Sequence, residues 1–147
     1  METVTSPLDN LCGPGKVLHR EAPGAREFKG LKTSGMVRLE DAQNPDVSLE
    51  GRFDLAYNSA HALSLAALRW HGYRSTNRYV VFQVLPHTLG LGPEVWRVLA
   101  KCHDLRNLSE YEGGLDIDDR IVRDLIIACQ TVLEKLEQLG PLGIKGR

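Results

Sequence analysis

Polar side chains in the C-terminal third of the chain have the types needed for chemistry on a phosphate group. If this segment is helical, His103, Arg106, Asn107 and Glu110 fall within one arc of roughly 100°, with Tyr111 at its margin. Arginine can bind phosphate through paired hydrogen bonds, and histidine can transfer protons near neutral pH. The spacing alone leaves two interpretations open. One is a solvated face with an Arg106–Glu110 ion pair, and the other is a face through which two copies associate.

Histidine and cysteine spacing argues against a metal site. No two histidines are three or four residues apart, so no helix would present a two-histidine metal pair. The cysteines are Cys12, Cys102 and Cys129, an odd number without a C-x-x-C pair. This usage predicts reduced thiols in a cytoplasmic protein. We therefore expect no metal.

Two further motifs do not predict a site. Gly13-Pro14-Gly15-Lys16 lacks the spacing of a phosphate-binding loop, and Pro14 removes an amide donor. Cys102-His103-Asp104 cannot converge as a triad, because consecutive helical residues point about 100° apart. We expect no cofactor.

The charge balance limits which partners the chain can bind. With 18 basic and 19 acidic residues, the formal net charge is −1, so purely electrostatic binding to nucleic acid or to an anionic membrane is not expected. Any RNA contact must use a local patch. Arg69, Arg74 and Arg78 form a small basic cluster, either a solvated turn or a contact for phosphates.

The hydrophobic pattern predicts an all-α, antiparallel, up-and-down bundle of four to five helices. Ser48 and Asp116 are suited to cap the second and last helices. The run Tyr79–Leu85 resembles a strand, but we predict a helix because no second strand-like run is present to pair with it. The expected helices span residues 25–42, 49–71, 76–88, 93–112 and about 117–139. Tyr57, Trp70 and Trp96 are expected to pack between helices or at an interface.

Composition divides the chain into three parts. Residues 1–23 are rich in proline and glycine and are expected to form an arm or loop, residues 24–140 the bundle, and residues 141–147 a flexible tail. The sequence contains neither a signal peptide pattern nor an apolar stretch long enough for a membrane span. We expect a cytoplasmic protein without a membrane partner.

A resemblance to a known family adds to this interpretation. The segment Arg106-Asn107-Leu108-Ser109-Glu110-Tyr111, followed by Gly113 and Asp116, resembles the Arg-Asn segment of HEPN domains (higher eukaryotes and prokaryotes nucleotide-binding). Residues 38–42, 52–60 and 72–74 resemble bacterial single-domain HEPN proteins. The resemblance extends from about Arg26 to Leu139.

The resemblance implies a helical bundle that dimerises through the helices carrying the motif. Many HEPN domains are metal-independent endoribonucleases with an Arg-x4-6-His motif. Bacterial single-domain members are often paired with a minimal nucleotidyltransferase as a toxin–antitoxin module. In some of these systems the nucleotidyltransferase modifies a tyrosine two residues beyond the motif histidine. Here Arg106 matches the motif arginine and Asn107 the asparagine after it.

This sequence departs from the motif at the histidine. Tyr111 occupies the position five residues after Arg106, and Gly113 stands where the modified tyrosine would be. Tyrosine, with an ordinary pKa near 10, is a poor base at neutral pH, so weak or absent ribonuclease activity is expected unless His103 substitutes.

Three hypotheses follow for the function. The first is a nucleotide- or RNA-associated binding module that forms a homodimer through the second and fourth predicted helices, residues 49–71 and 93–112. The second is a metal-independent endoribonuclease, a toxin, that uses Arg106 with Tyr111 or His103 and is assisted by Asn107. The third is a non-catalytic protein that binds a nucleotidyltransferase through the same face.

Overall fold

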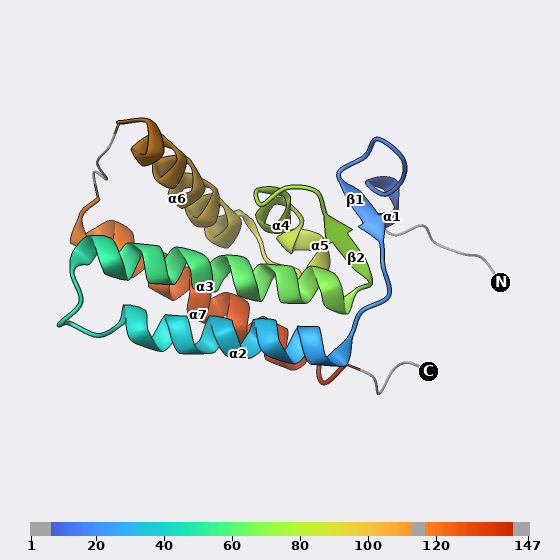
Figure 1. Ribbon diagram of the computed structural model, residues 1–147, viewed down its shortest axis with the longest axis horizontal. Helices are drawn as coiled ribbons and strands as arrows, with labels where there is room; N and C mark the ends of the chain where they lie inside the picture. The colour runs from blue at the N-terminus through green and yellow to red at the C-terminus, as the bar shows by residue number, and fades with distance from the viewer. Residues whose placement is uncertain (1–6, 113–116, 143–147) are drawn as a thin grey trace.

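Four long helices form the body of the protein in the computed structural model, which describes residues 7–112 and 117–142. Consecutive long helices run in opposite directions, with α6 inclined to the other three (Figure 1). The predicted all-α bundle is therefore confirmed. Its long helices are α2 (Ala25–Ala42), α3 (Leu49–Trp70), α6 (Pro93–Glu112) and α7 (Asp119–Gln138).

Helix α3 is the central element of the bundle. It begins after Ser48, whose hydroxyl accepts a hydrogen bond from the Gly51 amide at 3.0 Å, as the capping pattern predicts. Apolar residues cover most of its circumference, and it packs against α2, α7, α6 and the short helices after β2. Only a narrow strip of α3 reaches solvent, including Asp54, Asn58 and His61.

Small residues allow α2 and α3 to approach closely. A methyl group added at Gly35 would lie 2.6 Å from Leu63 Cγ, a distance that real side chains do not tolerate. The buried Ser59 hydroxyl donates a 2.7 Å hydrogen bond to the Gly35 carbonyl across this contact. Gly35, which weakens α2 taken alone, is thus required by the packing of the two helices.

A small sheet joins the N-terminal arm to the body. The arm contains α1 (Pro7–Asn10) and β1 (Leu18–Arg20), and β1 pairs antiparallel with β2 (Tyr73–Ser75) in the register Leu18↔Ser75. The expectation that no strand pair exists was wrong for these segments. Three-residue strands are too short to show the alternation that identifies a strand in a sequence.

Between β2 and α6 the chain forms two short helices rather than the single one predicted over 76–88. They are α4 (Val80–Gln83) and α5 (Leu85–Thr88), and the break falls at Val84. Pro86 explains the break, because its ring lacks an N–H and would clash with a carbonyl four residues earlier in a continuous helix. The strand-like run Tyr79–Leu85 is not a strand, as predicted.

The last helix begins later than predicted. Asp118, not Asp116, is its N-cap, since the Asp118 carboxylate accepts a 2.9 Å hydrogen bond from the Ile121 amide. Asp116 itself lies outside the described residues. Across the described ranges, no helix combines the length and the apolar character needed to cross a membrane.

Candidate functional site

A hydrogen-bonded cluster joins α3 to α6 and contains two of the four candidate site residues, His103 and Asn107. The Tyr57 hydroxyl lies 2.8 Å from Nδ1 of His103, and the Asn107 side-chain nitrogen lies 3.0 Å from Nε2 of the same ring. Tyr57 is buried, His103 is half-buried and Asn107 is exposed. The cluster therefore runs from the core to the surface, and Tyr57 packs between helices as expected.

The surroundings of the His103 imidazole favour its uncharged form. Burial lowers its pKa, the charge of Arg106 lowers it further, and the carboxylate of Asp104 partly opposes both. A neutral ring satisfies its two contacts when Nδ1 carries the proton and Nε2 accepts from the Asn107 amide. The ring of Tyr79 packs against the imidazole, with the two ring centroids 5.0 Å apart.

Arg106, a third candidate residue, lies beside this cluster. Its guanidinium carbon is 5.0 Å from the centroid of the Tyr57 ring, and its Nε is 3.8 Å from an Asp54 carboxylate oxygen. The fold thus brings Arg106 toward α3. The side chains of Glu110, the expected ion-pair partner, and of Tyr111, the motif substitution, lie outside the described residues.

A second imidazole next to the cluster was not singled out from the sequence. His61 follows Tyr57 by one helical turn on α3 and packs edge-on against Phe82. Burial lowers its pKa to about 4, and the positive charges of Arg78 and Arg106 add to this effect. Its position on the narrow polar line of α3 was the signal that could have identified it.

The basic cluster predicted after α3 separates into side chains with different environments. Arg69 is buried inside the protein, with a relative exposure of 1%. Arg74 forms ion pairs with Glu21 and Glu27 at 3.0 and 2.8 Å. Arg78 is exposed and lines two neighbouring hollows.

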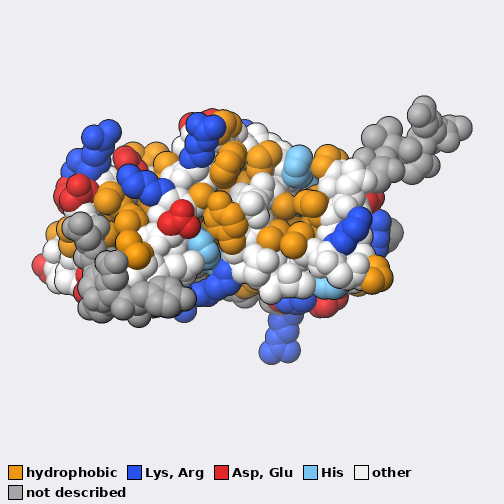
Figure 2. All heavy atoms as spheres, turned by 90° about the horizontal axis from the view of Figure 1, so that it is seen from above, with side chains coloured by type: hydrophobic (Ala, Val, Ile, Leu, Met, Phe, Trp, Pro, Cys, Tyr) orange, Lys and Arg blue, Asp and Glu red, His pale blue; other side chains and the backbone are white. Residues whose placement is uncertain are grey.

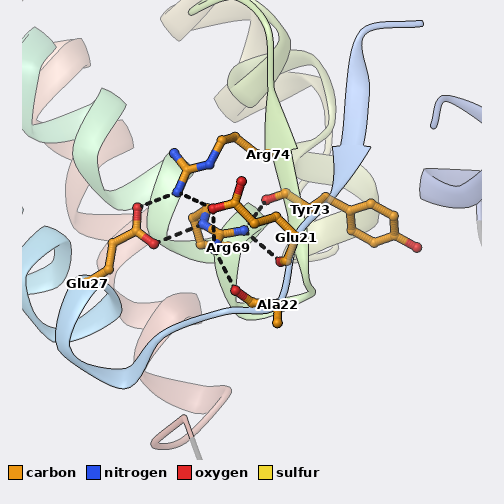
Figure 3. Close-up of polar contacts among 6 residues, drawn as sticks. All are labelled: Glu21, Ala22, Glu27, Arg69, Tyr73 and Arg74. Carbon is orange, nitrogen blue, oxygen red and sulfur yellow. Dashed lines mark hydrogen bonds and ion pairs between the residues drawn. The ribbon is translucent and has the colours of Figure 1, made fainter. Parts of the chain in front are cut away.

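Arg69 holds the N-terminal arm against the bundle. Its guanidinium donates to the carbonyls of Glu21, Ala22 and Tyr73 at 2.9 to 3.1 Å, and its Nε lies 3.1 Å from a Glu27 carboxylate oxygen (Figure 3). These partners come from the arm, α2 and β2. A buried charge with this many partners serves structure, because its partners leave little room for a ligand.

The described residues do not provide a cluster of metal ligands, and Cys102-His103-Asp104 does not form a triad. No group of three or more potential metal ligands occurs within the part of the chain that the structure describes. Cys102 points into the core while Asp104 is exposed, so Cys102, His103 and Asp104 do not converge. Trp70 donates to the Gly140 carbonyl at 3.3 Å and is a packing residue, as expected.

The face of the molecule seen from above carries charges of both signs (Figure 2). Figure 2 shows basic and acidic side chains both present on the face seen from above, with hydrophobic side chains gathered between them. Binding of an anion must therefore depend on a few positioned cations. No family model matches the chain, and no curated protein or solved structure matches it either. The resemblance to HEPN domains stays a prediction.

Proposed function

We propose that this protein is a HEPN-like, RNA-associated binding module whose contacts to RNA phosphates are made by Arg106 and Asn107 on α6, beside His103. The observation that carries the proposal is that His103 and Arg106 both contact Tyr57 of α3, while Asn107 contacts the other ring nitrogen of His103. The cluster holds a cation and an amide donor near an uncharged imidazole. This combination suits a phosphate ester, which accepts charge-assisted hydrogen bonds.

The test is RNA binding by matched arginine variants. Arg106→Gln removes the cation of the cluster. Arg97→Gln makes the same charge change nine residues earlier on α6. At 3.6 residues per turn, this spacing places Arg97 on the opposite face of the helix from Arg106. Fluorescence anisotropy with labelled RNA should show binding weakened roughly tenfold by Arg106→Gln, the loss expected for a charge-assisted hydrogen bond. Equal affinities for the two variants would contradict the proposal.

A second candidate function is metal-independent RNA cleavage. It is favoured by the placement of Arg106 and an uncharged His103 in one cluster, since cleavage needs a proton acceptor and a cation near the phosphate. Nε2 of His103 would have to release Asn107 to act as a base. End-labelled RNA incubated in EDTA should be cut by wild-type protein and not by the Arg106→Ala or His103→Gln variants.

The proposal includes a homodimer and a nucleotidyltransferase partner in the cytoplasm. Because α2, α7 and the short helices cover most of α3, a dimer would use α6, where Trp96 is half-buried and Leu108 is exposed. All three cysteines are free thiols, which agrees with a reducing compartment. Light scattering of the wild type and of Leu108→Glu tests the dimer. Co-purification with a small nucleotidyltransferase encoded beside this chain tests a toxin–antitoxin-type pairing.

A further inference from the structure

Two hollows meet at His61 on the side of the bundle formed by α2, α3 and the turn after β2. The larger, about 410 Å³, lies between α2 and α3, and the smaller, about 190 Å³, lies against β2 and residues 76–78. They share His61, Leu65 and Arg78 in their linings. Because of these shared residues, the two hollows form one surface depression, which we call the His61 groove.

The lining of the His61 groove is cationic. Arg38, Arg74 and Arg78 line it together with the imidazole of His61, and no aspartate or glutamate does so among the described residues. This composition is unexpected for a chain whose acidic residues outnumber its basic ones, 19 to 18. A local excess of positive charge in a concave surface attracts anions.

Two of these arginines remain available for a ligand. The charge of Arg74 is offset by its ion pairs with Glu21 and Glu27. Arg38, by contrast, is exposed and hydrogen-bonds only the neutral Ser34 within the described residues. Arg78 is exposed and makes no ion pair with any carboxylate in the described ranges. Both guanidinium groups can thus bind an anion without first breaking an ion pair.

We propose that the His61 groove is a phosphate-binding site that holds the backbone of single-stranded RNA between Arg38 and Arg78. The inference rests on the proposed function and specifies where RNA continues beyond the α6 cluster. Amide and hydroxyl groups of Asn58, Ser34 and Thr76 add neutral hydrogen-bonding groups along the groove.

The groove recognises the backbone rather than the bases. No phenylalanine, tyrosine or tryptophan of the described residues lines either hollow, so the groove lacks the aromatic platforms on which single-stranded bases stack. Contacts to phosphates position a nucleic acid without reading its sequence. Oligouridine and oligoadenosine of equal length should therefore bind the groove with similar affinities.

The groove and the α6 cluster are electrostatic neighbours. The charges of both Arg78 and Arg106 act on His61, and both also act on His103. The two imidazoles thus lie within the combined field of the two arginines. We therefore expect an RNA strand bound by Arg106 to place its next phosphates toward Arg78.

His61 offers a readout at the site itself. Its pKa is lowered first by burial and then by the positive charges around it. A bound phosphate supplies an opposite charge and raises that pKa. The NMR titration midpoint of His61 should therefore rise on binding.

The experiment compares two double variants with the same change in charge. Arg38→Gln/Arg78→Gln removes the two groove cations, and Arg26→Gln/Arg97→Gln removes two arginines that do not line the groove. The groove variant should bind RNA about tenfold more weakly for each arginine lost. Its salt dependence, the slope of log K against log salt, should fall by about 0.7 for each lost phosphate contact. The control should match the wild type in both.

Each outcome has a defined meaning. If the groove variant binds RNA like its control while Arg106→Gln is impaired, the groove inference is wrong and the proposed function stands. If the wild type binds no RNA, the proposed function is wrong, and titration with inorganic phosphate or uridine monophosphate decides the groove alone. A rise of the His61 titration midpoint on adding phosphate to the wild type, but not to the groove variant, supports a site for a small phosphate ligand. An unchanged midpoint in the wild type overturns the inference.

Discussion

The Tyr57 hydroxyl and Nδ1 of His103, 2.8 Å apart, form a polar link between α3 and α6. The tyrosine is buried and the histidine is half-buried, so loss of the hydroxyl leaves a ring nitrogen in a partly dry environment. This link turns Nδ1 of His103 toward the core and leaves Nε2 facing Asn107.

Tyr57→Phe should lower the free energy of unfolding by about 1 kcal/mol, the usual contribution of such a hydrogen bond. The ring remains and keeps its contact with Arg106. Tyr79→Phe is the matched control, because its ring also packs on His103 but its hydroxyl makes no hydrogen bond within the described residues. Urea denaturation measures both variants, and equal stabilities would show that the Tyr57 hydroxyl contributes nothing.

Arg69→Met should destabilise the protein by roughly 3–5 kcal/mol, because it leaves the carbonyls of Glu21, Ala22 and Tyr73 without their donor and removes one of the two cations that Glu27 contacts. The exposed pair of Arg123 with Asp119 on α7 provides the comparison. Arg123→Met should change stability by less than about 0.5 kcal/mol. Thermal unfolding of the two variants tests the difference, and similar melting temperatures would contradict the structural role of Arg69.

Two glycines of α2 should respond in opposite directions to alanine. Gly30→Ala should stabilise the protein by up to about 1 kcal/mol, since nothing lies within 4 Å of the added methyl group and alanine favours the helix. Gly35→Ala should destabilise it by about 1–3 kcal/mol, because the methyl group would overlap Leu63. Chemical denaturation of both variants measures the sign, and stabilisation by Gly35→Ala would argue against the close approach of α2 and α3.

His61 should remain uncharged well below the ordinary pKa of histidine, with an NMR titration midpoint at about 4. Between about 6.5 and 4 the unfolded chain binds a proton that the folded chain does not, so stability falls as the pH falls through this window. His61→Gln should flatten this part of the stability profile.

The charge of Arg78 can be separated from burial in the same titration. Arg78→Gln should raise the midpoint of His61, because it removes a neighbouring positive charge, and Arg97→Gln should leave it unchanged. A midpoint near the ordinary value in the wild type would show that His61 is more solvated than the structure indicates.

The three cysteines should differ sharply in reactivity. Burial raises the pKa of both Cys102 and Cys129 to about 12, and only the thiolate reacts with alkylating agents and disulfide reagents. Cys12 is half-exposed. A thiol assay of the native protein should therefore detect one fast thiol, which Cys12→Ser removes, and denaturant should expose the remaining two. Fast reaction of the native Cys12→Ser variant would contradict this.

The sequence was sufficient to predict the long helices because each combines a clear apolar stripe with local start or stop signals. Ser48 caps α3 as expected, and α2 and α6 have the predicted bounds. The elements that were missed are those that long-range contacts stabilise. Strands β1 and β2 are each three residues long and pair across a wide separation in the chain, so neither has a local signal.

The candidate site was predictable only along α6. Helical spacing places His103, Arg106 and Asn107 on one face, but it does not say which other helix that face meets. The contributions of Tyr57 and His61 depend on how α3 is rotated in the bundle, and that of Arg78 depends on the path of the turn after β2. Arg69 is buried and structural, whereas Arg78 is exposed and lines the groove. Two arginines look the same in the sequence, so this difference could not be predicted from residue type.

The attachment of the N-terminal arm determines where this protein can be shortened. A truncated chain that starts at Gly24 would keep the long helices but lose β1 and the Glu21 and Ala22 carbonyls that accept from Arg69. The buried Arg69 guanidinium would then lack two of its carbonyl acceptors, and β2 would lose the strand with which it pairs. The smallest autonomous folding unit is therefore longer than the helical bundle, and it includes the segment from α1 onward.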